Sequence, residues 1–300
     1  MSNTAPESRC GFAAIIGPAN AGKSTLLNRL IGTKLAIVSP KAQTTRFRVL
    51  GVLMRGPAQI LLVDTPGIFR PRRRLDRAML GAAWTGAQDA DLVLLLVDSR
   101  AGLTADVRDM LPRLRDRPTW LVLNKIDLVA PVRLLPLAAE LNALASFAET
   151  FMVSATTGDG LDRLLDALAE AVPAGPHLYP DDQLTDLPDR LLAAELVREQ
   201  IFLQTHEEVP YGTTVETESW RQRPDGSVRV DATIYVSRSG QKAILIGDGG
   251  KRIRDIGSRA RQELERLLDC RIHLFLNVKE RAGWDEETAR LRALGLDDEG

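Results

Sequence analysis

The chain has 300 residues, a length typical of two domains, and 44% of them are hydrophobic, which is enough to form a packed core. Its formal net charge of −1 excludes binding of nucleic acid through overall charge, so any such surface must be a local patch. Cys10 and Cys270 are the only cysteines, which excludes a disulfide framework and a cysteine-based zinc site and fits a reducing cytoplasm.

The first half of the chain alternates apolar runs with helical patterns. We expect strands at residues 12–16, 59–63, 92–97, 120–123 and 150–153, with helices that include 105–114, 134–147 and 161–172. Strands that alternate with helices predict an α/β domain with a mostly parallel sheet covered on both faces. In such a sheet the functional loops lie at the carboxyl ends of the strands.

A glycine-rich loop follows the first predicted strand and leads into a helical pattern. Strand, loop and helix in this order are the context of a phosphate-binding loop. Gly17 and Gly22 let successive main-chain N–H groups face one anion, and Lys23 can reach the β- and γ-phosphates. The Ser24 hydroxyl can bind Mg²⁺. The nucleotide-binding residues predicted here are Gly17, Pro18, Ala19, Asn20, Ala21, Gly22, Lys23, Ser24 and Thr25.

An acidic loop follows the predicted strand 59–63. Asp64 can hold Mg²⁺, usually through a water molecule, and the Gly67 N–H can bond the γ-phosphate. A plain turn is the alternative, since this composition is good turn chemistry. The nucleotide-binding residues predicted here are Asp64, Thr65, Pro66 and Gly67.

A polar loop, residues 39–46, lies between these two motifs. A threonine on a mobile loop at this place could complete the Mg²⁺ shell only when the γ-phosphate is bound. The sequence offers Thr44 and Thr45 and does not choose between them. The predicted metal ligands are therefore Ser24, Asp64 and either Thr44 or Thr45.

Two further loops follow the last two predicted strands of this half. Asn124, Lys125 and Asp127 form a pattern that recognises the purine base of a nucleotide. The Asp127 carboxylate can accept hydrogen bonds from the ring N–H and the exocyclic amine of guanine, whereas adenine offers no matching donors. The second loop, Ser154, Ala155 and Thr156, can present a main-chain N–H to the guanine oxygen. Together they predict selectivity for guanine.

These five motifs, in this order and at these strand ends, resemble a Ras-like GTPase domain. The resemblance implies GTP and GDP as ligands, Mg²⁺ as cofactor and GTP hydrolysis as the activity. Ile68 stands where Ras-type enzymes place a water-orienting glutamine, so we expect slow intrinsic hydrolysis. Asn20 matches an asparagine that helps some related GTPases hold K⁺, with a simple turn residue as the alternative. The predicted catalytic residues are Lys23, Asn20, Thr44, Thr45 and Gly67.

A segment rich in proline and glycine, residues 174–182, interrupts the periodicity and is typical of a linker. We therefore predict a flexible tail at 1–9, a GTPase domain at 10–173, this linker, and a second domain at 183–300. The second domain has different patterns: a helix at 190–205, strands at 213–221 and 228–237, a helix at 251–268 and a closing strand at 271–278. Pro224 to Gly226 predicts the hairpin turn between the first two strands.

A Gly-x-x-Gly loop precedes the long helix of the second domain. Such a loop lets a nucleic-acid backbone approach closely, and nearby cations can hold its phosphates. Asp248 inside the loop opposes phosphate binding and lowers the affinity that we expect. The order of elements around the loop resembles a KH domain of the prokaryotic, α+β arrangement. The predicted RNA-binding residues are Ile246, Gly247, Asp248, Gly249, Gly250, Lys251, Arg252 and Arg254.

A Ras-like GTPase domain followed by one KH domain resembles the Era GTPases over nearly the whole chain. The likeness includes residues 41–46, the Tyr179-Pro180 linker, residues 208–211 and the Trp284 segment. It implies binding near the 3′ end of 16S ribosomal RNA and a role in maturing the small ribosomal subunit. The sequence identifies no partner protein.

The competing hypothesis is a signalling GTPase associated peripherally with the inner membrane, whose KH-like region docks a protein. No lipidation motif or basic amphipathic helix favours it. The predicted location is therefore cytoplasmic, with a peripheral membrane-associated fraction left open.

Overall fold

The computed structural model describes residues 7–69, 71, 73–293 and 296, so most of the predicted tail lies outside the described residues. The described chain divides into two compact units. The first holds residues 7–36, 45–186 and 296, and the second holds 37–44 and 187–293. The domain bounds predicted from the sequence stay a prediction. That residues 37–44 pack with the second unit was not expected.

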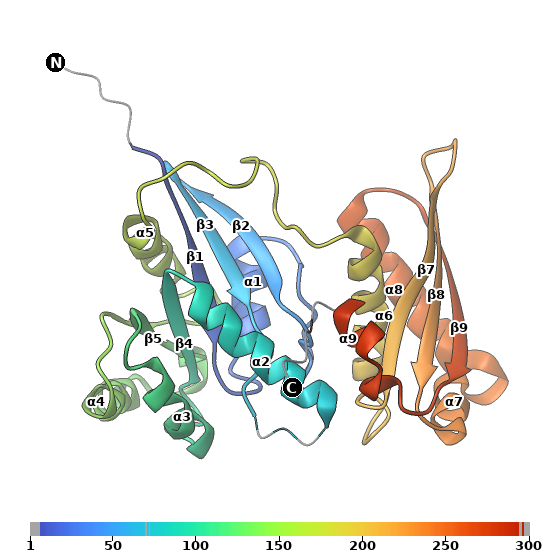
Figure 1. Ribbon diagram of the computed structural model, residues 1–300, viewed down its shortest axis with the longest axis horizontal. Coiled ribbons are helices and arrows are strands. Elements are labelled where there is room, and N and C mark those ends of the chain that lie inside the picture. Colours follow the sequence, from blue (N-terminus) through green and yellow to red (C-terminus); the bar gives the residue numbers. More distant parts are fainter. Residues whose placement is uncertain (1–6, 70, 72, 294–295, 297–300) are drawn as a thin grey trace. The chain divides into compact units, whose positions relative to one another are not determined.

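The first unit is built on a six-stranded sheet with strand order β2-β3-β1-β4-β5-β6. Strands β1 to β5 are labelled in Figure 1. Only β2 is antiparallel to its neighbour, β3, and the other neighbouring pairs are parallel. The α/β prediction with a mostly parallel sheet is therefore confirmed. The strands are β1 (Arg9–Ile16), β2 (Val49–Arg55), β3 (Ala58–Asp64), β4 (Leu92–Asp98), β5 (Thr119–Asn124) and β6 (Thr150–Met152).

The described residues of this unit form five α-helices and three short 3₁₀ helices. The α-helices are α1 (Lys23–Ile31), α2 (Arg74–Asp89), α3 (Ala105–Met110), α4 (Leu134–Leu144) and α5 (Leu161–Ala171). The 3₁₀ helices are η1 (Leu111–Leu114), η2 (Ile126–Leu128) and η3 (Pro131–Arg133).

Two of the predicted helices of this unit needed correction. The predicted helix 105–114 divides into α3 and η1, because Pro112 in the first turn of η1 has no N–H to continue the α-helical ladder. The predicted helix 134–147 ends at Leu144, where the chain becomes extended at Ala145. Strand β2 and helix α2 were not named from the sequence.

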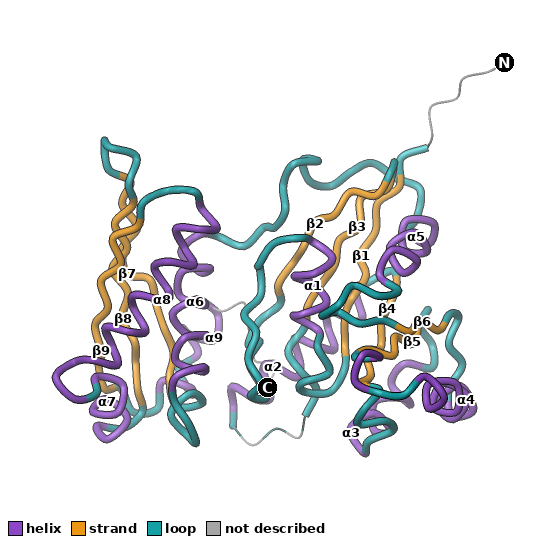
Figure 2. Tube along the Cα trace, turned by 180° about the vertical axis from the view of Figure 1, so that it is seen from behind, coloured by secondary structure: helices purple, strands orange, loops and turns teal. Residues whose placement is uncertain are grey.

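Buried apolar residues hold the helices on the sheet. On β4, Val93, Leu95 and Val97 lie in one core cluster with Ala83 of α2 and Met110 of α3. Helix α1 lies over β2 and β3 (Figure 2). There a side chain at Gly51 of β2 would meet Ile31 at 2.8 Å, so the missing Cβ allows this close packing. With β3, β1, β4 and β5 parallel, their carboxyl ends lie at one edge of the sheet.

The second unit is an α+β structure with a three-stranded sheet in the order β7-β8-β9. β7 and β8 form an antiparallel hairpin, and β8 and β9 are parallel. The predicted hairpin turn is present, with Gly226 at a φ of 78°. The elements are α6 (Asp189–Gln204), β7 (Thr213–Gln222), β8 (Val228–Val236), α7 (Ser239–Ile246), η4 (Asp248–Gly250), α8 (Lys251–Leu268), β9 (Ile272–Glu280), η5 (Trp284–Glu286) and α9 (Thr288–Ala293).

Candidate nucleotide-binding site

The predicted phosphate-binding loop connects β1 to the N-terminus of α1. Gly22 is the N-cap of α1 and has a φ of 100°, in the left-handed region that favours glycine. A Cβ at Gly22 would lie 2.4 Å from Nδ2 of Asn124. That amide donates to the Ala21 carbonyl at 2.9 Å, so a residue of the base-reading motif also holds the phosphate loop. The loop thus presents the free N–H groups of a helix N-terminus to a ligand.

Lys23 is buried inside this loop, with 6% of its surface exposed. Its Nζ donates to the carbonyl oxygens of Gly17 at 3.1 Å and Pro18 at 2.9 Å. Burial lowers the Lys23 pKa to about 8, and the nearby Asp64 carboxylate partly opposes this change. Main-chain carbonyls are weak partners for an ammonium group, so the Lys23 side chain can exchange them for phosphate oxygens.

Ser24, Thr45 and Asp64 form an oxygen cluster beside the loop. The Ser24 hydroxyl donates to Asp64 Oδ2 at 2.6 Å and lies 2.8 Å from Thr45 Oγ1. Thr45 Oγ1 donates to the same carboxylate oxygen at 3.3 Å. Thr44 is not in this cluster, because its hydroxyl donates to the Lys41 carbonyl at 2.9 Å. Of the two threonines that the sequence left open, Thr45 is the one beside Ser24.

The cluster has the chemistry of a magnesium site. Asp64 is fully buried, and its Oδ1 has no hydrogen-bond partner within the described chain. Burial raises the Asp64 pKa to about 6, against the opposing effect of Lys23. Mg²⁺ prefers hard oxygen ligands and is commonly held by one carboxylate together with substrate phosphates. Two hydroxyls and a carboxylate with an unused oxygen fit that ion.

The Asp64–Gly67 loop closes against the phosphate loop. The Ile68 N–H donates to the Gly17 carbonyl at 3.1 Å. A Cβ at Gly67 would lie 3.1 Å from Cα of Ala19, so the main chain at Gly67 lies close to the phosphate loop. The Ile68 side chain is 8% exposed and packs in the apolar core. It therefore has no polar group for orienting an attacking water.

The two predicted base-reading loops lie at the ends of β5 and β6. Asn124 is buried, and its Oδ1 accepts from the Ala155 N–H at 3.0 Å, which joins the two motifs. The Ser154 hydroxyl donates to Asp127 Oδ1 at 2.6 Å. Asp127 itself is exposed, so its carboxylate is accessible to a base. Four of the predicted motifs are thus linked by contacts at one edge of the sheet.

The sequence interpretation missed Asp98, the last residue of β4. Lys125 Nζ donates to Asp98 Oδ2 at 2.8 Å and to the Asn20 carbonyl at 2.6 Å. These two bonds fix the direction of the Lys125 side chain in the predicted base-reading loop. The sequence could have identified Asp98 as a candidate site residue, because it directly follows the predicted strand 92–97 and the carboxyl ends of such strands carry functional loops.

The predicted RNA-binding loop lies between α7 and α8 in the second unit. Gly247, Gly249 and Gly250 have φ values of 69°, 53° and 74°. A Cβ at Gly249 or Gly250 would meet no atom of the described residues within 4 Å, so the main chain there is open to close approach. Lys251 and Arg254 are exposed.

Arg252 differs from its cationic neighbours in this loop. Its Nη1 donates to the Ile244 carbonyl at 2.9 Å. A Cβ at Gly247 would lie 2.8 Å from the Arg252 Cβ. This arrangement indicates a structural part for Arg252, which supports the turn from α7 into α8.

Comparisons with known proteins match two separate parts of the chain to two families. The family model for 50S ribosome-binding GTPases matches residues 12–125, and the KH-domain model matches residues 208–285. GTPase Era of Rhizobium meliloti is 52% identical over 291 residues, which cover 96% of this chain and 93% of the relative. GTPase Era of Brucella suis is 51% identical over 295 residues, covering 98% and 95%.

Two solved structures of Era are also similar to this chain. A crystal structure of Aquifex aeolicus Era bound to GDP and AlF₄⁻ has 38% identity and a TM-score of 0.91, covering 96% of this chain and 99% of that one. A crystal structure of Era with MgGDPNP and nucleotides 1506–1542 of 16S ribosomal RNA has 38% identity and a TM-score of 0.92, with the same coverage. Fold and site therefore define a P-loop GTPase with a C-terminal KH domain. The chain belongs to the Era family of GTPases. It is a GTP hydrolase, and Mg²⁺ use follows from the family.

Proposed function

We propose that this GTPase binds the 3′ region of 16S ribosomal RNA in a GTP-controlled manner and assists maturation of the small ribosomal subunit in the cytoplasm. The observation that carries the proposal is the open glycine loop at Gly249 and Gly250, flanked by the exposed cations Lys251 and Arg254. Its support is the 38% identity to an Era solved with a 16S ribosomal RNA fragment.

In this proposal the main groups of the nucleotide site have separate roles. Lys23 and the loop N–H groups stabilise charge on the transferred phosphoryl group. Ser24, Thr45 and Asp64 hold Mg²⁺, which neutralises charge on the phosphate oxygens when bound. Asp127 reads the guanine edge. With an apolar residue at position 68, intrinsic hydrolysis is slow.

The test of this function is RNA affinity in three nucleotide states. The full chain is titrated with a 3′ fragment of 16S ribosomal RNA in the presence of a GTP analogue, of GDP, and without nucleotide. We expect the tightest binding with the GTP analogue, and equal affinities in all three states would refute GTP control.

No helix among the described residues has the length and apolar composition to cross a bilayer. The peripheral-membrane alternative predicts sedimentation with anionic vesicles and not with ribosomal subunits.

Removing both exposed cations of the glycine loop is expected to weaken RNA binding. In Lys251→Ala/Arg254→Ala, affinity for the RNA fragment should fall about tenfold, and the slope of log K against log salt should become shallower by about 0.7 for each lost phosphate contact. Arg266→Ala is the control. Arg266 lies near the end of α8, the helix that also carries Lys251 and Arg254, and it pairs with Glu263 at 2.9 Å, so its removal should not affect RNA binding. An unchanged salt slope in the double variant would place the RNA elsewhere.

Potassium is expected to accelerate hydrolysis through Asn20. Asn20 is exposed on the phosphate loop, with a φ of 63°, and can offer its side-chain oxygen to a cation beside the phosphates. We expect GTP turnover at least severalfold faster in potassium than in sodium buffer, and Asn20→Ala should remove the difference. Equal wild-type rates in both buffers would leave Asn20 as a turn residue.

A further inference from the structure

Residues 37–44, the loop that precedes Thr45, pack with α6 in the second unit. The Val38 N–H donates to Glu199 Oε1 at 2.9 Å. Lys41 Nζ donates to the carbonyl of the helix C-cap, Thr205, at 2.5 Å, and to a second carbonyl in the last turn of α6. A cation at a helix C-terminus satisfies carbonyls that have no partner within the helix. The loop is therefore held on α6 at two places.

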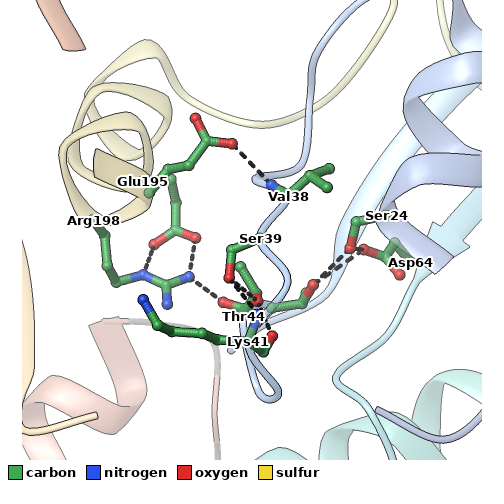
Figure 3. Close-up of polar contacts among 10 residues, drawn as sticks. Ser24, Val38, Ser39, Lys41, Thr44, Asp64, Glu195 and Arg198 are labelled. Carbon is green, nitrogen blue, oxygen red and sulfur yellow. Dashed lines mark hydrogen bonds and ion pairs between the residues drawn. The ribbon is translucent and has the colours of Figure 1, made fainter. Parts of the chain in front are cut away.

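A third contact involves the buried ion pair of α6. The Arg198 side chain is 2% exposed, and its Nε donates to Glu195 Oε1 at 2.7 Å. Its Nη2 donates both to Glu195 Oε2 and to the main-chain carbonyl of Thr44, the latter at 2.5 Å (Figure 3). Such charge-assisted bonds from a buried arginine are strong and directional. Arg198 thus holds the last residue of the segment by its carbonyl oxygen.

Holding this carbonyl affects the next residue directly. The peptide bond between Thr44 and Thr45 is planar, so the orientation of the carbonyl also sets the direction of the Thr45 N–Cα bond. With that plane fixed, only the φ and χ1 angles of Thr45 decide where its hydroxyl lies. Its hydroxyl lies 2.8 Å from Ser24 Oγ and donates to Asp64. The bond from Arg198 and the contact to the oxygen cluster are therefore one rigid peptide unit apart.

We propose that Arg198 is a positioning residue for GTP binding: it fixes the peptide plane that presents Thr45 to Mg²⁺ and the γ-phosphate, and so makes GTP affinity depend on helix α6 of the KH unit. This inference rests on the proposed role of Thr45. Because coupling between sites is reciprocal, any RNA-induced change in α6 alters GTP affinity by the factor with which GTP alters RNA affinity.

The pattern of affected nucleotides distinguishes positioning from a structural ion pair. Thr45 meets the ligand only when the γ-phosphate is present, so loss of positioning weakens GTP binding and leaves GDP binding unchanged. Loss of a merely structural pair would lower the unfolding temperature or weaken both nucleotides alike.

The experiment uses the full-length double variant Glu195→Gln/Arg198→Met. Removing both charges avoids a buried unpaired charge, which would destabilise the fold. With Mg²⁺ present, we expect affinity for a fluorescent non-hydrolysable GTP analogue to fall about tenfold, the loss typical of one charged hydrogen bond, while GDP affinity stays within about twofold. The matched control is Arg261→Met/Glu265→Gln, which removes an ion pair of 2.9 Å on α8 and should change neither affinity.

Two further variants make each outcome informative. If Thr45→Ala binds the GTP analogue like the wild type, the proposed role of Thr45 fails. If Thr45→Ala weakens binding and Glu195→Gln/Arg198→Met does not, only the role of Arg198 is overturned. Arg198→Lys keeps a cation for Glu195, so it provides the same comparison if the double variant proves unstable. Equal losses for the GTP analogue and GDP in a folded variant would also overturn the proposal.

Discussion

Replacing Lys23 by methionine is expected to reduce GTP hydrolysis by about 10²- to 10³-fold, the effect of losing a preorganised charge at a developing oxyanion. At pH 7 the Lys23 amine is mostly protonated, because burial lowers its pKa only to about 8. When phosphate arrives, its Nζ leaves the main-chain carbonyls of Gly17 and Pro18. Methionine keeps much of the side-chain volume inside the loop and removes only the charge. The measurement is single-turnover phosphate release at saturating GTP.

Two controls support the interpretation of the Lys23 variant. Lys242→Met, in helix α7 of the second unit, should hydrolyse GTP at the wild-type rate. The unfolding temperature of Lys23→Met should not fall, because the substitution removes a buried charge and leaves an apolar chain in its place. A Lys23→Met rate within about threefold of the wild type would contradict a catalytic role for this amine, since one lost oxyanion donor costs far more.

Replacing Asp127 by asparagine is expected to change base selectivity. Asp127 Oδ1 accepts from Ser154, and the exposed carboxylate can accept from the two N–H donors of the guanine edge. The asparagine side chain keeps one acceptor oxygen and replaces the other with an NH₂ donor. This donor would face the exocyclic amine of guanine, and two donors cannot form a hydrogen bond with each other. We expect GDP affinity to fall by about 10²- to 10³-fold, as for the loss of a charge-assisted bond with a buried donor left unpaired.

Xanthine carries a carbonyl where guanine carries that amine, so the same variant should gain affinity for XDP. Equilibrium titration with GDP and XDP measures both changes. Asp116→Asn, at an exposed position away from the site, should bind both nucleotides like the wild type. If Asp127→Asn kept its preference for GDP, another group would have to read the base.

The sequence predicted the strands of the nucleotide site well because their signals are local. Each of β1, β3, β4 and β5 is a short apolar run followed by a polar loop, and a parallel sheet buries such runs on both faces. Strand β2 was missed because Gly51 interrupts its apolar run. The reason for that glycine is distant in sequence: Ile31 of α1 occupies the space that a Cβ would need.

Helix α6 shows a second limit of sequence patterns. Its residues 192–202 are all buried, including Glu195, Arg198 and Glu199, although charges at these spacings are typical of a solvated helix face. Burial of these groups depends on partners far along the chain, such as the Val38 N–H and the Thr44 carbonyl. No local pattern in the helix specifies those partners.

The sequence by itself was enough to predict a phosphate loop, an acidic loop and a guanine-reading loop on one sheet, because each prediction depends on residue types at short spacing. Only the tertiary structure decided that Thr45, and not Thr44, lies beside Ser24 and Asp64. It also decided that Asp98 orients Lys125 and that Arg198 holds the Thr44 carbonyl. Adjacent threonines are chemically identical, so the direction of each side chain is set by contacts between residues far apart in the chain.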